Sequence, residues 1–304
     1  MKKNLLLCVA TEKGLAVLTA VHQANMVADI YICSYQESSV SESFNQDILD
    51  YAAQHELGVL DWKDIKRKSS SLIEDKGIWS IICVGWKYLI PSGIMTQVNG
   101  RVLVTHDSLL PRYRGYAPLP TALINGDKTV GVSVIIANDE VDAGDILYQK
   151  EVSVGANDTI NDLIKKLLPF FSEGIVTSLE KIMGDNPERR AQNHEMATYS
   201  IWRNEADLII DWNQSADTVE RTIRALGPPY MGARTRLDDD IVIIQKAKVV
   251  PELKFEIRQV GKIWKLSQKG EPVVICGKGM LLITGAEINK KSLIPLTKVR
   301  QMFH

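Results

Sequence analysis

The chain has 304 residues, with 36 Lys and Arg against 37 Asp and Glu, so its formal net charge is −1. Apolar residues make up 45% of it and charged residues 24%, and it contains four cysteines. These values exclude collagen-like, low-complexity and disulfide-rich proteins, and the length is typical of about two globular domains. The balanced charge gives no general attraction for nucleic acid or for an anionic membrane.

The amino-terminal residues resemble a secretory leader only in part. The apolar run Leu5–Ala10 is shorter than the roughly 7–15 residues of a signal-peptide core, and charged Glu12 and Lys13 follow it closely. No run approaches the roughly 18 apolar residues of a membrane helix. The cysteines lie far apart within apolar runs, which favours buried free thiols over a metal site with closely spaced ligands. We expect a cytoplasmic protein with no membrane segment and no bound metal.

Short apolar runs alternate with amphipathic segments over the first two thirds of the chain. Strands are predicted at Leu5–Ala10, Asp29–Ser34, Ile78–Val84, Val102–Thr105, Val130–Ala137 and Ile146–Val154, and helices at Gly14–Ala24, Ser43–His55 and from about Thr159 to Met183. This alternation predicts an α/β domain with a Rossmann-like, mostly parallel sheet and helices on both faces. Ligands bind such sheets beyond the carboxyl ends of the strands, so the residues after Val84 and Thr105 are site candidates.

The pattern changes after about residue 205. A helix capped by Asn213–Ser215 and ending at Leu226 is predicted, because Gly227-Pro228-Pro229 stops it. Short strands follow, predicted at Ala233–Leu237, Ile241–Val250, Lys262–Leu266, Pro272–Cys276 and Leu281–Ile288. They predict a small, OB-like antiparallel β domain. We therefore divide the chain into a first domain (1–189), a linker (190–205), and a carboxy-terminal helix with the β domain (206–304).

His106 directly follows a predicted buried strand. Its ordinary pKa near neutrality suits a general base, and a nearby carboxylate would orient it. The candidate carboxylates are Asp139, Asp142 and Asp145, in a turn that begins where another strand ends. The alternative is a structural histidine that bonds a loop carbonyl. Spacing alone leaves both open.

A longer motif surrounds this histidine. It consists of His106-x-Ser108-Leu109-Leu110-Pro111-x-Tyr113-Arg114-Gly115, Ala117-Pro118, Ile124-Asn125-Gly126-Asp127, Gly131-Val132-Ser133 and Asp142-x-Gly144-Asp145-Ile146. The motif resembles the formyltransferase family, whose members transfer a formyl group from 10-formyltetrahydrofolate to an amine. They include methionyl-tRNA formyltransferase and sugar-nucleotide N-formyltransferases. The resemblance extends to Ala197-Thr198-Tyr199, to the helix after Ile210-Asp211-Trp212, and to the later β segments.

The resemblance implies roles for three positions. His106 matches the histidine that takes the amine proton, and Asp142 matches the aspartate that holds this histidine. The family's asparagine, which hydrogen-bonds the formyl oxygen, lies two residues before the histidine, where this chain has Val104. Thr105 points to the opposite face of the strand and is a poor substitute. Three interpretations follow. Another part of the protein or a water supplies the missing hydrogen bond, the enzyme transfers a different chemical group or uses a different donor molecule, or the protein has lost activity and only binds ligand.

The resemblance also implies binding residues. Those expected to hold the 10-formyltetrahydrofolate donor are Trp86, Leu89, Ile90, Asp139, Asp142 and Asp145. Those expected to bind the acceptor are Ser108, Arg112, Tyr113 and Arg114. The alternative role of Trp86 is packing in the core. The alternative role of Arg114 is to hold its own loop by bonding backbone carbonyls.

The acceptor is predicted from a loop. Members that act on tRNA have a basic loop after the second strand, whereas Ser34–Ser43 here is polar and acidic, with no Lys or Arg. Phosphate contacts supply most nucleic-acid affinity, so nucleic acid is disfavoured. The expected acceptor is a small-molecule amine, with a nucleotide-linked amino sugar as the best match. Methionyl-tRNA formyl transfer and a catalytically altered member stay as alternatives, and a homodimer is left open.

Overall fold

The computed structural model describes residues 3–36, 43–67, 69–184 and 187–304. Its internal contacts divide the chain into two compact units. The first unit contains the chain up to Pro118, Thr129–Ser153 and Ile164–Ser200. The second contains Leu119–Lys128, Val154–Leu163 and Ile201–His304. The division at residues 189 and 206 stays a prediction from the sequence.

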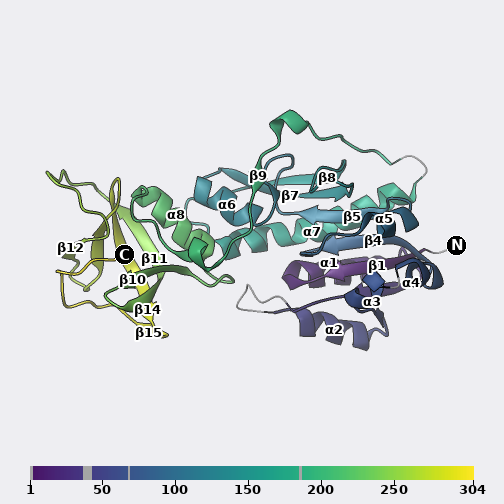
Figure 1. The fold of residues 1–304 in the computed structure, drawn as a ribbon, viewed down its shortest axis with the longest axis horizontal. Helices are drawn as coiled ribbons and strands as arrows, with labels where there is room; N and C mark the ends of the chain where they lie inside the picture. Colours follow the sequence, from purple (N-terminus) through teal and green to yellow (C-terminus); the bar gives the residue numbers. More distant parts are fainter. Residues whose placement is uncertain (1–2, 37–42, 68, 185–186) are drawn as a thin grey trace. The chain divides into compact units, whose positions relative to one another are not determined.

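The first unit is built on a sheet with the strand order β3-β2-β1-β4-β5-β7-β8 (Figure 1). Its strands are β1 (Asn4–Val9), β2 (Ile30–Cys33), β3 (Gly58–Val59), β4 (Ile78–Val84), β5 (Val102–His106), β7 (Thr129–Ile136) and β8 (Ile146–Ser153). The pairs among β1 to β5 are parallel, whereas β7 runs antiparallel to both β5 and β8. The mostly parallel α/β prediction is therefore confirmed.

Helices cover both faces of this sheet. They are α1 (Thr11–Ala24), α2 (Asn45–Gln54), α3 (Trp62–Arg67), α4 (Ser69–Asp75), α5 (Ser92–Gln97) and the larger part of α7 (Ile160–Met183). Cys8 lies on the face that packs against Trp62 and Ile94, from α3 and α5. Val9 points to the opposite face, where an added Cβ at Gly14 would lie 3.0 Å from its Cβ, so α1 packs closely there. The short helices α3, α4 and α5 were not predicted.

The second unit contains a six-stranded antiparallel sheet, in the order β10-β11-β14-β13-β12 with β15 beside β14. Its strands are β10 (Ala233–Leu237), β11 (Asp240–Val250), β12 (Ile263–Leu266), β13 (Pro272–Ile275), β14 (Met280–Ile288) and β15 (Lys291–Ser292). Its helices are the 3-10 helix η2 (Glu205–Leu208) and α8 (Ala216–Leu226), and it also contains α6 (Pro118–Asn125) from Leu119 on and the first turn of α7, up to Leu163. Ser215 caps α8 as predicted, since its hydroxyl accepts the Thr218 N–H at 3.1 Å. The antiparallel β prediction is confirmed.

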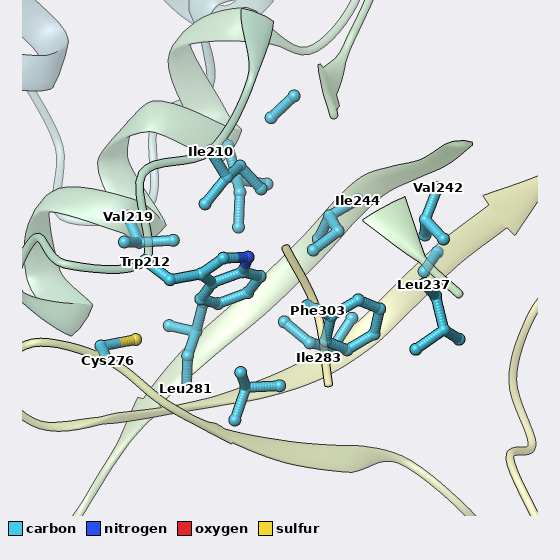
Figure 2. Packing of buried hydrophobic residues seen from close by; sticks show 14 of the residues in the cluster. Ile210, Trp212, Val219, Leu237, Val242, Ile244, Cys276, Leu281, Ile283 and Phe303 are labelled. Carbon is cyan, nitrogen blue, oxygen red and sulfur yellow. The ribbon is translucent and has the colours of Figure 1, made fainter. Parts of the chain in front are cut away.

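The core of the second unit forms around two stacked rings (Figure 2). The Trp212 and Phe303 ring centroids lie 5.7 Å apart, with 23° between the ring planes. The indole N–H of Trp212 donates to the Thr235 hydroxyl at 2.9 Å, so this buried donor is satisfied. Ile283 of β14 belongs to the same cluster.

The four cysteines are buried free thiols, as expected. Cys8 pairs in register with both Cys33 and Cys83 across three adjacent strands. Burial raises the pKa of the Cys8 thiol well above its ordinary value, and the two neighbouring thiols add to this rise. Of the helices in the described part of the chain, none combines the length and apolar character that crossing a membrane requires.

Candidate active site

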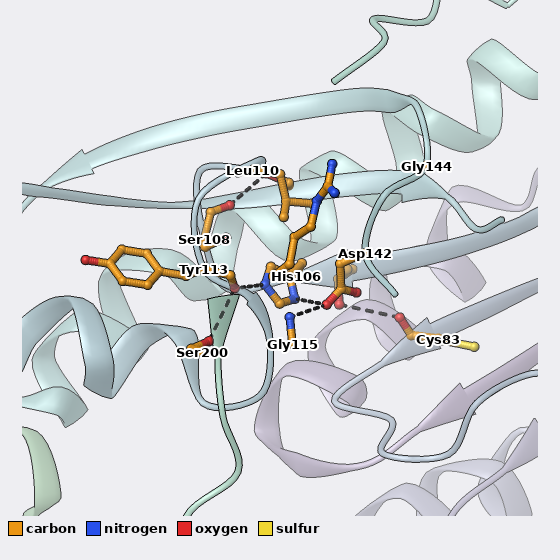
Figure 3. Close-up of polar contacts among 12 residues, drawn as sticks. Cys83, His106, Ser108, Leu110, Tyr113, Gly115, Asp142, Gly144 and Ser200 are labelled. Atoms are coloured by element: carbon orange, nitrogen blue, oxygen red, sulfur yellow. Dashed lines mark hydrogen bonds and ion pairs between the residues drawn. The ribbon is translucent and has the colours of Figure 1, made fainter. Parts of the chain in front are cut away.

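His106 is the last residue of β5 and is 6% exposed. Its Nε2 lies 2.7 Å from the carbonyl oxygen of Tyr113, and its Nδ1 lies 3.5 Å from Oδ2 of Asp142 (Figure 3). A carbonyl oxygen only accepts, so Nε2 carries a hydrogen in this arrangement. The histidine therefore contacts a loop carbonyl and also faces a carboxylate, which combines the structural and catalytic interpretations.

Asp142 is the candidate carboxylate that reaches the histidine. Its Oδ2 also accepts the backbone N–H of Gly115 at 2.8 Å. Its backbone has a φ of 53°, in the left-handed region that non-glycine residues rarely occupy. Such conformations persist only where the surrounding contacts determine them. Asp139 is exposed. The backbone carbonyl of Asp145 accepts the Ile136 N–H at 3.0 Å, so Asp145 is bonded to the end of β7.

The loop from Ser108 to Gly115 carries the carbonyl that meets His106. Tyr113 has a φ of 59°, again left-handed. Its backbone N–H donates to the Thr198 hydroxyl at 2.9 Å, and the Ser200 hydroxyl donates to its carbonyl oxygen at 3.4 Å. The strand β6 (Arg114–Gly115) pairs in parallel with β9 (Tyr199–Ser200), which follows the 3-10 helix η1 (His194–Met196).

The segment from Gln192 to Ser200 is thus part of the site, although the sequence indicated only a linker. Gln192, Thr198 and Ser200 each bond the backbone of the loops that carry Tyr113 and Asp142. The family-like run Ala197-Thr198-Tyr199 was the available signal. A polar segment without periodicity gives no indication of which distant loop it will contact.

Val104 lies two residues before His106 and belongs to an apolar environment. It pairs in register with Cys83 of β4 and Ile135 of β7. Its side chain packs against Leu110, Ile135 and Ile146. The Thr105 hydroxyl faces the Cys83 carbonyl at 3.4 Å. The position of the family's asparagine therefore lacks an amide here, and Thr105 does not replace it.

The segment expected to bind the donor is aromatic. Trp86 lies in a group of rings with Tyr35, Trp62 and Tyr88, at centroid distances of 5.2, 5.3 and 5.4 Å respectively. The indole Nε1 of Trp86 is buried with no hydrogen-bond partner among the described residues. Ile90 and Trp86 are partly buried against the core, and Leu89 is 72% exposed. Trp86 therefore packs against the core and also has an indole N–H that is available to donate a hydrogen bond.

The predicted acceptor-binding residues lie in different environments. The Ser108 hydroxyl donates to the Arg112 carbonyl at 2.6 Å, which closes the loop on itself. The exposed Arg112 guanidinium lies 4.9 Å from the Tyr113 ring centroid, and its Nη2 donates to the Tyr113 hydroxyl at 3.1 Å. Arg114 is 2% exposed and donates to Oε1 of Gln192, so its contacts favour the loop-pinning role.

A cavity of about 460 Å³ lies at the other end of β5. Asn99–Arg101, which precede β5, line it together with Asp145 and with Ile136–Asn138, which begin at the last residue of the antiparallel β7. Burial lowers the pKa of Arg101 from its ordinary value. The lining includes Gly144 and Asp145, which follow Asp142 in its turn, but not His106.

Comparison with known families identifies the class. The family model described as Formyl transferase matches residues 11–179, and the model described as Formyl transferase, C-terminal domain, matches residues 204–301. The chain belongs to the formyl transferase family. The methionyl-tRNA formyltransferase of Wigglesworthia glossinidia brevipalpis is 33% identical over 211 residues. That match covers 69% of this chain and 65% of the relative, which is less than two thirds of its length.

Two solved structures share the fold. The N-formyltransferase of Helicobacter canadensis, in complex with folinic acid and dTDP-3-aminofucose, gives a TM-score of 0.68 at 15% identity over 93% of this chain and 99% of that one. A sugar 3N-formyl transferase, solved in the presence of dTDP and 5-N-formyl-THF, gives 0.67 at 14% identity over 96% and 99%. At these identities the likeness concerns the fold alone.

Proposed function

We propose that this protein is an N-formyltransferase that moves a formyl group from 10-formyltetrahydrofolate to a small-molecule amine, a nucleotide-linked amino sugar. The observation that carries the proposal is the buried His106–Asp142 pair at the carboxyl end of β5, with the Asp142 carboxylate fixed by the Gly115 N–H. An oriented histidine beside a carboxylate is suited to move one proton during acyl transfer.

The proposed reaction needs a proton acceptor and charge stabilisation. The acceptor amine attacks the formyl carbon, the electrons of the carbonyl move to its oxygen, and Nδ1 of His106, the ring nitrogen without a hydrogen while Nε2 donates to Tyr113, takes the proton that the amine nitrogen releases. The electrons on that oxygen then re-form the carbonyl as the bond to the folate nitrogen breaks, and His106 returns the proton to that nitrogen. Asp142 stabilises the imidazolium in between. Nδ1 of His106 is the nitrogen with the longer contact, at 3.5 Å, and such contacts often tighten when substrate binds.

For the donor, we propose the segment from Gly85 to Pro91 and the turn that carries Asp142. The unpartnered indole N–H of Trp86 supports this assignment, because a pterin or amide oxygen would satisfy it. Ile90 offers apolar contact beside it. Family membership supports the choice of a folate donor.

For the acceptor, we propose a sugar nucleotide because the Ser34–Ser43 loop is acidic and contains no Lys or Arg. Residues 37–42 of this loop lie outside the described residues. The exposed guanidinium of Arg112, beside the site, suits a phosphate or carboxylate of the acceptor. Both solved structures named above were obtained with dTDP or a dTDP-linked aminosugar.

A second candidate is methionyl-tRNA formyl transfer. The observation that favours it is the 33% identity to a methionyl-tRNA formyltransferase. The position of Val104 favours a third, in which catalysis is altered. Release of tetrahydrofolate should be measured with amino-sugar nucleotides and with methionyl-tRNA as alternative acceptors. Turnover with an amino-sugar nucleotide supports the proposal. Turnover with methionyl-tRNA alone contradicts the proposed sugar-nucleotide acceptor. The absence of turnover with every amine tested contradicts the proposed formyl transfer.

A further inference from the structure

Gln192 lies outside the motif that identifies the site, yet its side chain connects two loops of that site. It is 6% exposed. Its Nε2 donates to the carbonyl oxygens of Asp142 at 2.8 Å and of Gly144 at 2.7 Å. Its Oε1 accepts from Nε of Arg114 at 3.1 Å and from Nη2 at 2.7 Å. All four hydrogen-bonding positions of this amide are therefore used.

The orientation of this amide follows from its partners. A carbonyl oxygen only accepts and a guanidinium only donates, so the nitrogen must face Asp142 and Gly144, and the oxygen must face Arg114. Exchange of the two ends would place like groups together at every contact. The buried Arg114 in turn has the Gln192 oxygen as the acceptor for two of its N–H groups. The pair forms one buried connection between β6 and the Asp142 turn.

The connection acts where the site is most sensitive to displacement. Asp142 holds a left-handed φ of 53°, which a non-glycine residue keeps only under external restraint. Gln192 bonds the carbonyl of that same residue. The carboxylate of Asp142 meets His106 at 3.5 Å, so a shift of the turn by a fraction of an ångström changes this contact. The Gly115 N–H, one residue from Arg114, meets the same carboxylate.

We propose that Gln192 is a positioning residue: held by Arg114, it fixes the Asp142 turn so that the carboxylate stays against His106. The hydrogen bonds of its side chain go to Asp142, Gly144 and Arg114, and none of them goes to His106. Its effect on turnover rests on the proposed function, whereas its effect on the Asp142 turn does not. The titratable groups that contact this connection among the described residues are Asp142, Arg114 and His194, whose Nδ1 lies 3.4 Å from Nη2 of Arg114, and a Gln192→Met variant leaves all of them in place.

The first readout is hydrogen exchange of two adjacent backbone amides in the free protein. The Gly115 N–H bonds Asp142, whereas the Tyr116 N–H bonds the Ser200 carbonyl at 3.0 Å. In Gln192→Met, exchange of the Gly115 amide should rise by about tenfold or more, while that of Tyr116 stays within about threefold of the wild type. In an Asp142→Ala background, Gln192→Met should add less than about twofold at Gly115.

Two further variants make this readout specific. Gln192→Glu keeps an acceptor for Arg114 but loses both donations, so it replaces Gln192→Met if that variant does not fold and should give the same result. Gln245→Met is the control, because the Gln245 Nε2 donates to the Glu287 carboxylate at 2.9 Å within the second unit and bonds neither site loop. It should leave Gly115 exchange unchanged. Wild-type protection of Gly115 in a folded Gln192 variant overturns the proposal.

The second readout is turnover. Gln192→Met should lower kcat by about 10- to 100-fold with KM for both substrates little changed, because misplacement of a catalytic group costs rate rather than binding. In an Asp142→Asn background the further loss should be within about twofold. Equal losses in both backgrounds contradict an action through Asp142. If the wild type transfers no formyl group, the proposed function fails while the exchange result still decides the role of Gln192.

Discussion

Replacement of Val104 by Asn is expected to accelerate formyl transfer. The amide would lie two residues before His106 on β5, on the same face of the strand, because side chains alternate along it. There it can donate to the formyl oxygen as negative charge develops. Val104 itself offers no donor, and the Thr105 hydroxyl faces the Cys83 carbonyl instead.

The magnitude follows from two opposing terms. One oxyanion donor is worth about 10²–10³ in rate, or roughly 3–4 kcal/mol. Val104 packs against Leu110, Ile135 and Ile146, and the loss of these apolar contacts costs about 1–2 kcal/mol of stability. These apolar neighbours offer no hydrogen-bond partner that would hold the amide of the Val104→Asn variant in place. We therefore expect only part of the rate gain of a fixed oxyanion donor. The expected change is about a 10- to 100-fold rise in kcat and a fall of about 2 kcal/mol in unfolding free energy.

The assay is tetrahydrofolate release as a function of acceptor concentration, which gives kcat and KM separately. Val104→Ala is the matched control, since it removes the same packing and adds no donor, and its kcat should not rise. A folded Val104→Asn protein with kcat at or below the wild-type value contradicts the reasoning. It would indicate that valine shapes the pocket for another group or acceptor.

Three further outcomes are expected. Arg114→Ala should lower the unfolding free energy by about 3 kcal/mol in thermal or denaturant unfolding, because it leaves the buried Gln192 oxygen unpaired, whereas exposed Arg112→Ala should mainly raise the acceptor KM. A thiol reagent at pH 8 should modify none of the buried cysteines in the native protein and all four after unfolding; rapid native labelling contradicts their burial. Burial raises the pKa of Cys276 to about 12, with Arg258 opposing it. The thiol's contribution to stability is therefore full below the ordinary pKa near 9 and is lost as pH rises from there through about 12, so Cys276→Ala should lose less stability over that interval.

The sheet could be predicted because its strands are short and almost wholly apolar. Every predicted strand of the first unit forms within one residue of its expected ends. The short helix α6 (Pro118–Asn125) was missed, because Pro118 and Pro120 lie in its first turn, where proline is compatible with a helix but indicates a loop in a local reading. Local pattern therefore predicted six strands of the sheet, but neither the two-residue edge strand β3 (Gly58–Val59) nor the short helices that connect the strands.

The candidate site could be predicted only for residues that the family-like motif contains. His106 and Asp142 meet as the resemblance implied, across 36 positions of sequence. Gln192 contacts residues 48 to 78 positions away, and nothing local in a polar segment encodes such pairing. Arg114 stands in the motif beside Arg112, yet one is buried and the other exposed, because the burial of a side chain depends on the tertiary contacts of its loop.

The central claim is that His106 moves the proton in formyl transfer to a small amine. It is tested most directly by measuring the formylated product by mass spectrometry, with 10-formyltetrahydrofolate and an amino-sugar nucleotide, for the wild type and for His106→Ala. The matched control is His55→Ala, because His55 is an exposed histidine at the end of α2. We predict a loss of about 10²–10⁴ in kcat for His106→Ala and none for His55→Ala. A folded His106→Ala protein that retains most of the wild-type rate would contradict the account.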